Sequence, residues 1–217
     1  YACLLLLGLF VLLLSSKINM FILFGGAMIG IALKALQGKN RIKTLLAGGV
    51  AILAIALVMT ISPSVGGRIQ TLYKTLEAPE QVNKTDTESN AARILVWKAG
   101  WTLFTKHPFF GVGTGDVNDE LQHEYDRLGY SGVSEKRLNA HNQFLQSAIA
   151  TGLIGLILLS SLLVTLLVKA WRTENWLLLV FTLLIFLNSL VEGILERQAG
   201  VVFFAFFHAW LLKRDDL

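Results

Sequence analysis

The sequence predicts an all-α integral membrane protein with a large, partly helical loop on one face of the membrane. Of its 217 residues, 54% are hydrophobic and only 16% are charged, and the mean hydropathy is +0.59. A soluble domain is about one quarter charged. The apolar residues also fall in blocks, and one long polar segment interrupts them. These observations exclude an ordinary soluble globular domain.

Six apolar blocks predict membrane-spanning helices. A helix advances about 1.5 Å per residue, so about 20 apolar residues cross the hydrocarbon layer. The chain begins inside an apolar run, and we expect further helices upstream in a longer protein. The predicted spans are residues 1–16, 18–36, 44–61, 144–168, 176–191 and 200–212, of which the last is short.

Basic residues orient these spans. Three basic clusters follow alternate spans, and the positive-inside rule makes their shared face cytoplasmic. The opposite face, periplasmic in a Gram-negative inner membrane, then holds Lys17, residues 62–140 and residues 192–198. We therefore predict three spans in 1–61, a periplasmic loop domain in 62–140, and three spans with a cytoplasmic tail in 141–217. The basic clusters are Lys34, Lys39, Arg41 and Lys43; Lys169 and Arg172; and Lys213 and Arg214.

The predicted loop domain is several times longer than an ordinary connection of about 4–6 residues, which indicates function or a small fold. Apolar residues recur at helical spacing in 91–106, and proline stops this helix at His107. Trp97 and Trp101 share one face, which fits either a helix in the membrane interface or a helix packed on the spans. A second, more hydrophilic helix is predicted at 117–128.

The glycine cluster at 111–115 resembles a phosphate cradle only weakly. No strand precedes it and no Lys-Ser/Thr follows it, so it predicts a tight backbone turn. Asp116, Asp119 and Glu120 could bind a metal ion, but carboxylates one turn apart on a helix face are more often solvated surface, which is the favoured interpretation.

Two stretches resemble the O-antigen ligase and polymerase superfamily. They are RILVWKAGWTLFTKHPFFGVGTGDVND at 93–119 and HNQFLQSAIATGLIGLILL at 141–159. Their pattern is an arginine, a tryptophan four residues later, His-Pro, two hydrophobic residues and Gly-x-Gly-x-Gly, and then a histidine before a Gly-Leu-rich span. The SSK at 15–17 stands where many members have Ser-Arg-Gly. Here Lys17 replaces the arginine and Ile18 replaces the glycine. The segment LERQAGVVFFAFF at 195–207 resembles ligase-like members.

The resemblance implies a multi-span helical bundle of the GT-C type that acts as a metal-independent glycosyltransferase. Such enzymes take a glycan from undecaprenyl pyrophosphate on the periplasmic face. Ligases transfer it to lipid A–core, polymerases transfer it to another lipid-linked glycan, and some relatives transfer it to protein. Activity in the family maps to a loop arginine and to the histidine at the loop–helix junction, which match Arg93 and His141 here.

The chemistry of a pyrophosphate leaving group independently calls for cations near the membrane surface. Arginine stays charged and can hold phosphate oxygens through two parallel hydrogen bonds. Lys17 could instead extend to the membrane interface, and Arg68 could be a simple anchor. The cations assigned to the periplasmic face near span ends are Lys17, Arg68, Arg93 and Arg197.

His141 stands where the loop domain meets the fourth span. It could take a proton from an acceptor hydroxyl, which is worth about 10²–10⁴-fold, or it could position a phosphate or the acceptor. A lone histidine at a helix start is more commonly a cap or a surface residue. Glu192 could orient His141 or bind the acceptor, while Glu196 and Arg197 could form a scaffold pair. His208 is expected to pack within the last span.

Together these residues predict an inverting transfer of a lipid-linked glycan, with ligation to lipid A–core as the leading reaction. Metal ions, other cofactors and nucleic acid are not expected to take part. Chain polymerisation by the same chemistry is the alternative enzyme. A solute transporter is the alternative from another class, but transporters place ionisable residues at mid-span, and the first four spans have almost none.

Overall fold

The computed structural model describes residues 49, 83–85, 87 and 90–213. Apart from Gly49, which is helical, the first three predicted spans lie outside the described residues. Contacts divide the chain into two compact units, Tyr1–Gln70 and Thr71–Leu217, and the elements below belong to the second.

The described part of the second unit is helical and contains no strand, as the sequence predicts. The helices predicted at 91–106 and 117–128 are confirmed, and the second has the predicted bounds. The elements are α5 (Asn90–Lys106), α6 (Val117–Leu128), α7 (Ser131–Glu135), α8 (Gln143–Arg172), α9 (Trp176–Ser189), the 3-10 turn η1 (Ile194–Glu196) and α10 (Gln198–Lys213).

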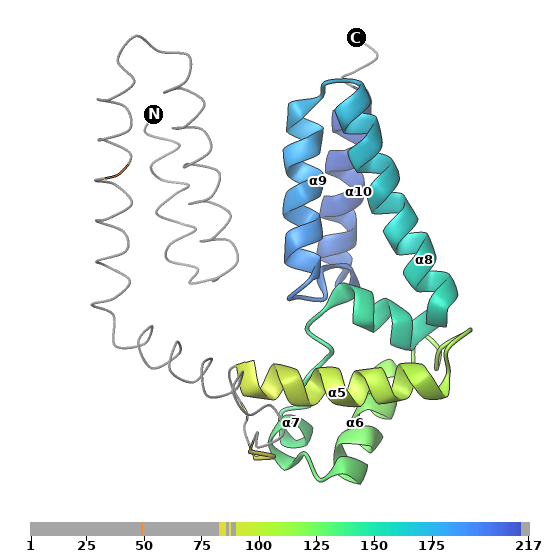
Figure 1. The fold of residues 1–217 in the computed structure, drawn as a ribbon, viewed down its shortest axis with the longest axis vertical. Coiled ribbons are helices and arrows are strands. Elements are labelled where there is room, and N and C mark those ends of the chain that lie inside the picture. The colour runs from red at the N-terminus through yellow and green to blue at the C-terminus, as the bar shows by residue number, and fades with distance from the viewer. Residues whose placement is uncertain (1–48, 50–82, 86, 88–89, 214–217) are drawn as a thin grey trace. The chain divides into compact units, whose positions relative to one another are not determined.

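The helices α5, α6 and α7 pack with the first segment of α8, residues 143–151, to form what we call the loop subdomain (Figure 1). Val96 of α5, Leu121 and Tyr125 of α6, and Ile149 of α8 are fully buried in its core. The buried residues of α5 recur every three or four positions, so α5 presents an apolar stripe to this core. Trp101, on the other side of α5, is 61% exposed.

α8 is broken at Gly152, whose φ of 67° and ψ of −156° belong to a region that only glycine adopts readily. The segment 108–113 lies against the break and satisfies the backbone groups that it frees. Three hydrogen bonds join them: Val112 N–H to Ile149 O at 2.9 Å, Gly113 N–H to Ala150 O at 2.9 Å, and Leu153 N–H to Pro108 O at 2.7 Å.

The predicted tight turn at the glycine cluster is confirmed, because Gly111 and Gly113 have φ of 68° and 99°. The span predicted at 144–168 lies within α8, but the helix is not straight, and its first segment belongs to the loop subdomain. About 20 residues follow the break, which gives a length of about 30 Å, the thickness of the hydrocarbon layer.

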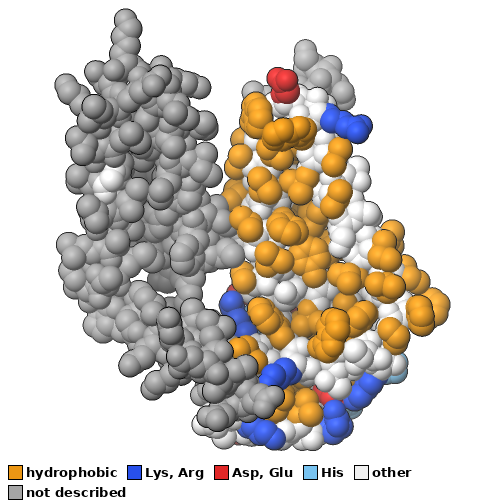
Figure 2. All heavy atoms as spheres, in the orientation of Figure 1, with side chains coloured by type: hydrophobic (Ala, Val, Ile, Leu, Met, Phe, Trp, Pro, Cys, Tyr) orange, Lys and Arg blue, Asp and Glu red, His pale blue; other side chains and the backbone are white. Residues whose placement is uncertain are grey.

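The rest of α8 packs with α9 and α10 as a bundle (Figure 1). Among the described helices, α8 is the one that is long and apolar enough to cross a membrane, while α9 and α10 are apolar but shorter. Apolar side chains cover much of the visible bundle surface (Figure 2). His208 is buried and packs as predicted, with its Nε2 3.1 Å from the Thr182 hydroxyl.

Candidate active site

His141 directly precedes α8 and has a left-handed backbone, with φ of 45°. This conformation costs a residue with a side chain about 1–2 kcal/mol, so its surroundings must hold it. Asn139 Oδ1 accepts the His141 N–H at 3.3 Å. Asn142 caps α8 by accepting from Leu145 N–H at 3.0 Å, and its amide donates to Leu190 O at 3.0 Å. Hydrogen bonds on both sides therefore fix the backbone at His141.

Glu192 joins His141 to Arg93, although the three residues are far apart in the sequence. Its Oε2 lies 3.2 Å from His141 Nδ1, and its Oε1 accepts from an Arg93 terminal nitrogen at 2.9 Å. The side chains of Arg93, Glu192 and His141 are 34%, 47% and 26% exposed, so all three are partly accessible to solvent. The two residues matched by the family resemblance thus meet on one carboxylate.

The electrostatics of this cluster keep Glu192 ionised. The hydrogen bond from His141 lowers the pKa of Glu192, against the opposing effect of burial, and Arg93 and Arg197 lower it further. A carboxylate only accepts, so the neutral imidazole donates through Nδ1 and leaves Nε2 without a proton. Within the described residues, no group hydrogen-bonds this Nε2. The lone pair is free to meet a substrate hydroxyl.

Glu196 forms a second carboxylate in the same cluster. It accepts a hydrogen bond from the Asn139 amide at 2.8 Å, and burial raises its pKa despite that bond. Among the described residues, no ion pair or hydrogen bond joins Glu196 to Arg197 as the suggested scaffold pair would require, and the Arg197 guanidinium makes no hydrogen bond, although its charge lowers the pKa of Glu196. Arg197 is exposed and lines the cleft described next.

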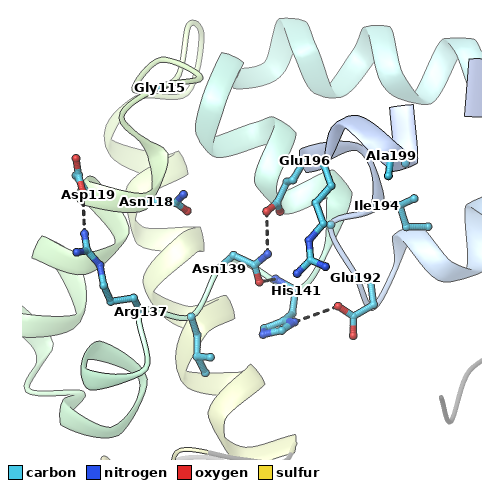
Figure 3. Close-up of a pocket in the computed structure, with 14 residues that line it drawn as sticks. Gly115, Asn118, Asp119, Arg137, Asn139, His141, Glu192, Ile194, Glu196 and Ala199 are labelled. Carbon is cyan, nitrogen blue, oxygen red and sulfur yellow. Dashed lines mark hydrogen bonds and ion pairs between the residues drawn. The ribbon is translucent and has the colours of Figure 1, made fainter. Parts of the chain in front are cut away.

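These residues line one side of an open cleft of about 990 Å³. In Figure 3, Glu192, Ile194 and Ala199 lie on one side, Asp119 and Arg137 lie on the other, and Asn139 and His141 lie between them. Arg93 contacts Glu192 but does not line the cleft. The lining residues are Gly115, Asn118, Asp119, Arg137, Leu138, Asn139, His141, Glu192, Gly193, Ile194, Glu196, Arg197, Ala199 and Gly200.

The cleft is built by contacts between the loop subdomain and the segment 192–197. Gln143 Oε1 accepts from Leu195 N–H at 2.7 Å and so ties the start of α8 to this segment. On the other side, the Trp97 indole donates to Ala140 O at 3.0 Å, beside His141. Trp97 therefore supports the site, a role that its place on the helix surface did not indicate.

Of the six residues singled out from the sequence, the structure brings Arg93, His141, Glu192 and Arg197 together. Lys17 and Arg68 lie outside the described residues. Sequence reasoning missed Asn139 and Gln143 as parts of the site, and it named Glu196 only as a scaffold partner of Arg197. Only the Asn142 cap had a local signal, because asparagine before an apolar helix is a typical N-cap.

Asp119 pairs with Arg137 at 3.1 Å and does not form a metal site with Asp116 and Glu120. In the part of the chain that the structure describes, no group of three or more His, Cys, Asp or Glu side chains could hold a metal ion.

The model of the O-antigen ligase family matches residues 2–160 of the chain. The chain belongs to the O-antigen ligase family. A search of curated proteins finds no match. Membership in the O-antigen ligase family, together with the apolar α8, makes the chain a bacterial membrane protein and a glycosyltransferase-like enzyme of the ligase or polymerase type. The family match includes Arg93 and His141 but ends before Glu192, so the contact of Glu192 with both residues lies outside what the family match covers.

Proposed function

We propose that this enzyme transfers a glycan from undecaprenyl pyrophosphate to a sugar hydroxyl on the periplasmic face of the inner membrane. Ligation of O-antigen to lipid A–core is the proposed reaction, by an inverting and metal-independent mechanism. The observation that carries the proposal is the contact of Glu192 with both Arg93 and His141. A basic imidazole nitrogen and a cation beside an open cleft are the groups that such a transfer needs.

The membrane arrangement supports a periplasmic cleft. Basic residues occupy the last turns of α8 and α10, namely Lys169, Arg172 and Lys213. In Figure 1 those turns lie at the end of the bundle opposite the loop subdomain. Since cytoplasmic ends are rich in Lys and Arg, we propose that α8, α9 and α10 cross the membrane with the loop subdomain in the periplasm. Spans in 1–61 would complete a bundle of the GT-C type, with the loop domain in 62–140 and the last three spans in 141–217.

In the proposed step, the acceptor hydroxyl oxygen attacks the anomeric carbon of the donor sugar. The new glycosidic bond forms as the bond between that carbon and the phosphate oxygen breaks, and the pyrophosphate leaves with the electron pair. Attack opposite the leaving group inverts the configuration. The hydroxyl proton passes to His141 Nε2, and the Glu192 carboxylate stabilises the resulting imidazolium while holding the ring in place.

The leaving pyrophosphate would be held by cations near the membrane surface. Arg197 lines the cleft, and its guanidinium makes no hydrogen bond or ion pair with the described residues, so it can bind phosphate. Arg93 uses one terminal nitrogen for Glu192 and has other N–H groups left for an anion. Lys17 and Arg68 are proposed from the sequence as further phosphate contacts. Removing one such contact typically costs about 10²–10³-fold in rate.

A substitution at His141 tests the proposal. His141→Asn keeps a residue that tolerates the left-handed backbone, so the fold persists, but it removes the basic nitrogen and should lower transfer about 10²–10⁴-fold. His107→Asn is the matched control, because His107 is exposed at the end of α5 and outside the cleft. Both genes would be returned to a strain that lacks the chromosomal copy.

The readout is a gel of the strain's lipopolysaccharide. Unsubstituted core with His141→Asn, and full O-antigen with His107→Asn, is the expected result for a ligase. Core carrying single repeats would instead assign the chain as a polymerase. Full O-antigen display with His141→Asn at normal protein levels would refute the assignment of His141.

A further inference from the structure

We propose that the far end of the cleft, formed by Asn118, Asp119 and Arg137, is a subsite for a sugar ring of the glycan substrate. This inference rests on the proposed function and deepens it. It assigns recognition of sugar hydroxyls to three residues that are distinct from the His141–Glu192 pair. Figure 3 shows Asp119 and Arg137 across the cleft from Glu192, with His141 between them.

The cleft is larger than the reacting hydroxyl and pyrophosphate alone would fill. Its volume of about 990 Å³ is at the upper end of the range for small-molecule sites, about 300–1,000 Å³. The His141 end supplies a base and cations, which suit the acceptor hydroxyl and the pyrophosphate. The other end remains open and polar, and a transferred or accepting glycan has further sugar residues beyond the reacting one.

The side chains at this end match the chemistry of a sugar. A sugar hydroxyl both donates and accepts hydrogen bonds, and it needs partners of both kinds. The Asp119 carboxylate accepts, the Arg137 guanidinium donates, and the Asn118 amide does both. Arg137 and Asp119 are each 69% exposed, and their ion pair at 3.1 Å holds the two planar groups together at the edge of the cleft.

The backbone at Arg137 carries an independent signal. Leu138 N–H bonds to Val133 O at 3.2 Å and Arg137 N–H to Ser134 O at 2.9 Å, which is the Schellman ending of a helix. In this motif the residue after the C-cap has a positive φ and is usually glycine. Here it is Arg137, with φ of 47°. The arginine occupies a position where glycine would be less strained.

Stability does not explain this arginine. Its ion pair with Asp119 is exposed on both sides, and exposed pairs contribute little to folding. A strained residue without a stabilising role is a reason to look for function. Arg137 and His141 are two of the three described non-glycine residues with positive φ, and both line this cleft.

The position of this end of the cleft relative to the bundle also fits a glycan. Asp119 lies in α6 and Arg137 follows α7, and both helices belong to the loop subdomain, which lies at one end of the α8–α10 bundle in Figure 1. A sugar chain approaching from water would meet this end first and reach His141 next. The pyrophosphate, anchored to its lipid, would take the end formed by the segment 192–197.

The test is Arg137→Gly, which removes the side chain and relieves the backbone. The purified full chain in detergent would be given polyprenyl-pyrophosphate-linked O-antigen and lipid A–core from the host bacterium. We expect an unchanged or higher thermal unfolding midpoint, an unchanged kcat, and a KM for the acceptor raised about 10-fold or more, because a charged hydrogen bond is lost. Asp119→Asn should raise the same KM. The matched control is Asp116→Asn, one turn away and outside the cleft lining, which should leave both KM values unchanged.

The outcomes separate the possible errors. A raised KM for the donor in place of the acceptor also supports the subsite and assigns the sugar to the donor glycan. Unchanged KM values for both substrates, or a fall in kcat alone, overturn the subsite. If His141→Asn is inactive in the same assay while Arg137→Gly behaves as wild type, only the subsite fails. If His141→Asn transfers glycan normally, the assigned base is wrong and the subsite loses its basis.

A binding measurement adds a readout that does not depend on turnover. The probe is the water-soluble glycan released from the host's lipopolysaccharide by mild acid. Saturation-transfer NMR should show transfer to its sugar protons with the wild-type chain and a clear loss with Arg137→Gly. Equal transfer with both proteins would contradict the inference.

Discussion

The break in α8 predicts a large effect for Gly152→Ala. The backbone of Gly152, with φ of 67° and ψ of −156°, lies in a region that is essentially restricted to glycine, and occupying it costs another residue about 1–3 kcal/mol. A Cβ there would also lie 2.3 Å from the carbonyl carbon and oxygen of Phe109. Backbone atoms cannot move aside as a flexible side chain can, so relief requires the segment 108–113 to separate from α8.

Separation would break the three hydrogen bonds that cross the break. Each contributes about 1 kcal/mol, so with the backbone strain of about 1–3 kcal/mol the expected loss of stability is about 4–6 kcal/mol. Gly111→Ala should act similarly, because its Cβ would lie 2.4 Å from Ile149 O. The double variant should lose much less than the sum of the two, since either change alone already opens the same contact.

The assay is thermal unfolding of the purified chain in detergent, with limited proteolysis to locate the opened segment. Gly115→Ala is the matched control, because it belongs to the same glycine cluster and nothing lies within 4 Å of its Cβ position. Gly152→Ala should lower the unfolding midpoint by several degrees and expose the segment 108–113 to protease. Equal midpoints for Gly152→Ala and Gly115→Ala would refute the reasoning.

Two carboxylates give the remaining predictions. Glu192→Gln should lower glycan transfer about 10-fold or more, because the ring of His141 loses the charge that stabilises its protonated form. The hydrogen bond from His141 and the nearby charges lower the pKa of Glu192. The contribution of Glu192 to the free energy of unfolding is therefore present above the ordinary pKa of about 4.5, and it is lost as the pH falls through the lowered pKa. A stability difference between wild type and Glu192→Gln that is larger at pH 4 than at pH 7 would contradict this. Glu124 is buried and pairs with Lys106 and Arg127, and Arg127 contributes most to lowering its pKa. Glu124→Gln should cost about 1–3 kcal/mol at neutral pH and less in acid, with unchanged KM values in the transfer assay; a stability equal to wild type at neutral pH would count against the pair.

Local features of the fold could be predicted because short-range patterns determine them. The helix at 117–128 has polar residues around a narrow apolar stripe and glycine after its end, and α6 has these bounds. The helix at 91–106 ends where proline follows His107, and α5 ends at Lys106. In both cases the residues within one or two turns contain the needed information.

The break in α8 and the second half of the site could not be predicted in this way. Gly152 stands in the run GLIGL, where a single glycine is compatible with a continuous helix. Only its contact with the segment 108–113 decides the conformation. Likewise, the partner of Asn139 is Glu196, 57 residues away, and no local pattern links the two. Arg137 was missed because it lies just after α7, a helix of five residues that carries no periodic signal.

The break also explains how one helix serves both the membrane and the site. The first segment of α8 lies along α5, whereas the rest joins α9 and α10 (Figure 1). A straight α8 could not lie along both, so it would separate His141 either from the loop subdomain or from the segment 192–197. The hydrogen bonds from the segment 108–113 hold the bend, and the bend lets His141 meet Arg93 through Glu192. We therefore expect the segment 108–113 to act on catalysis by fixing this geometry.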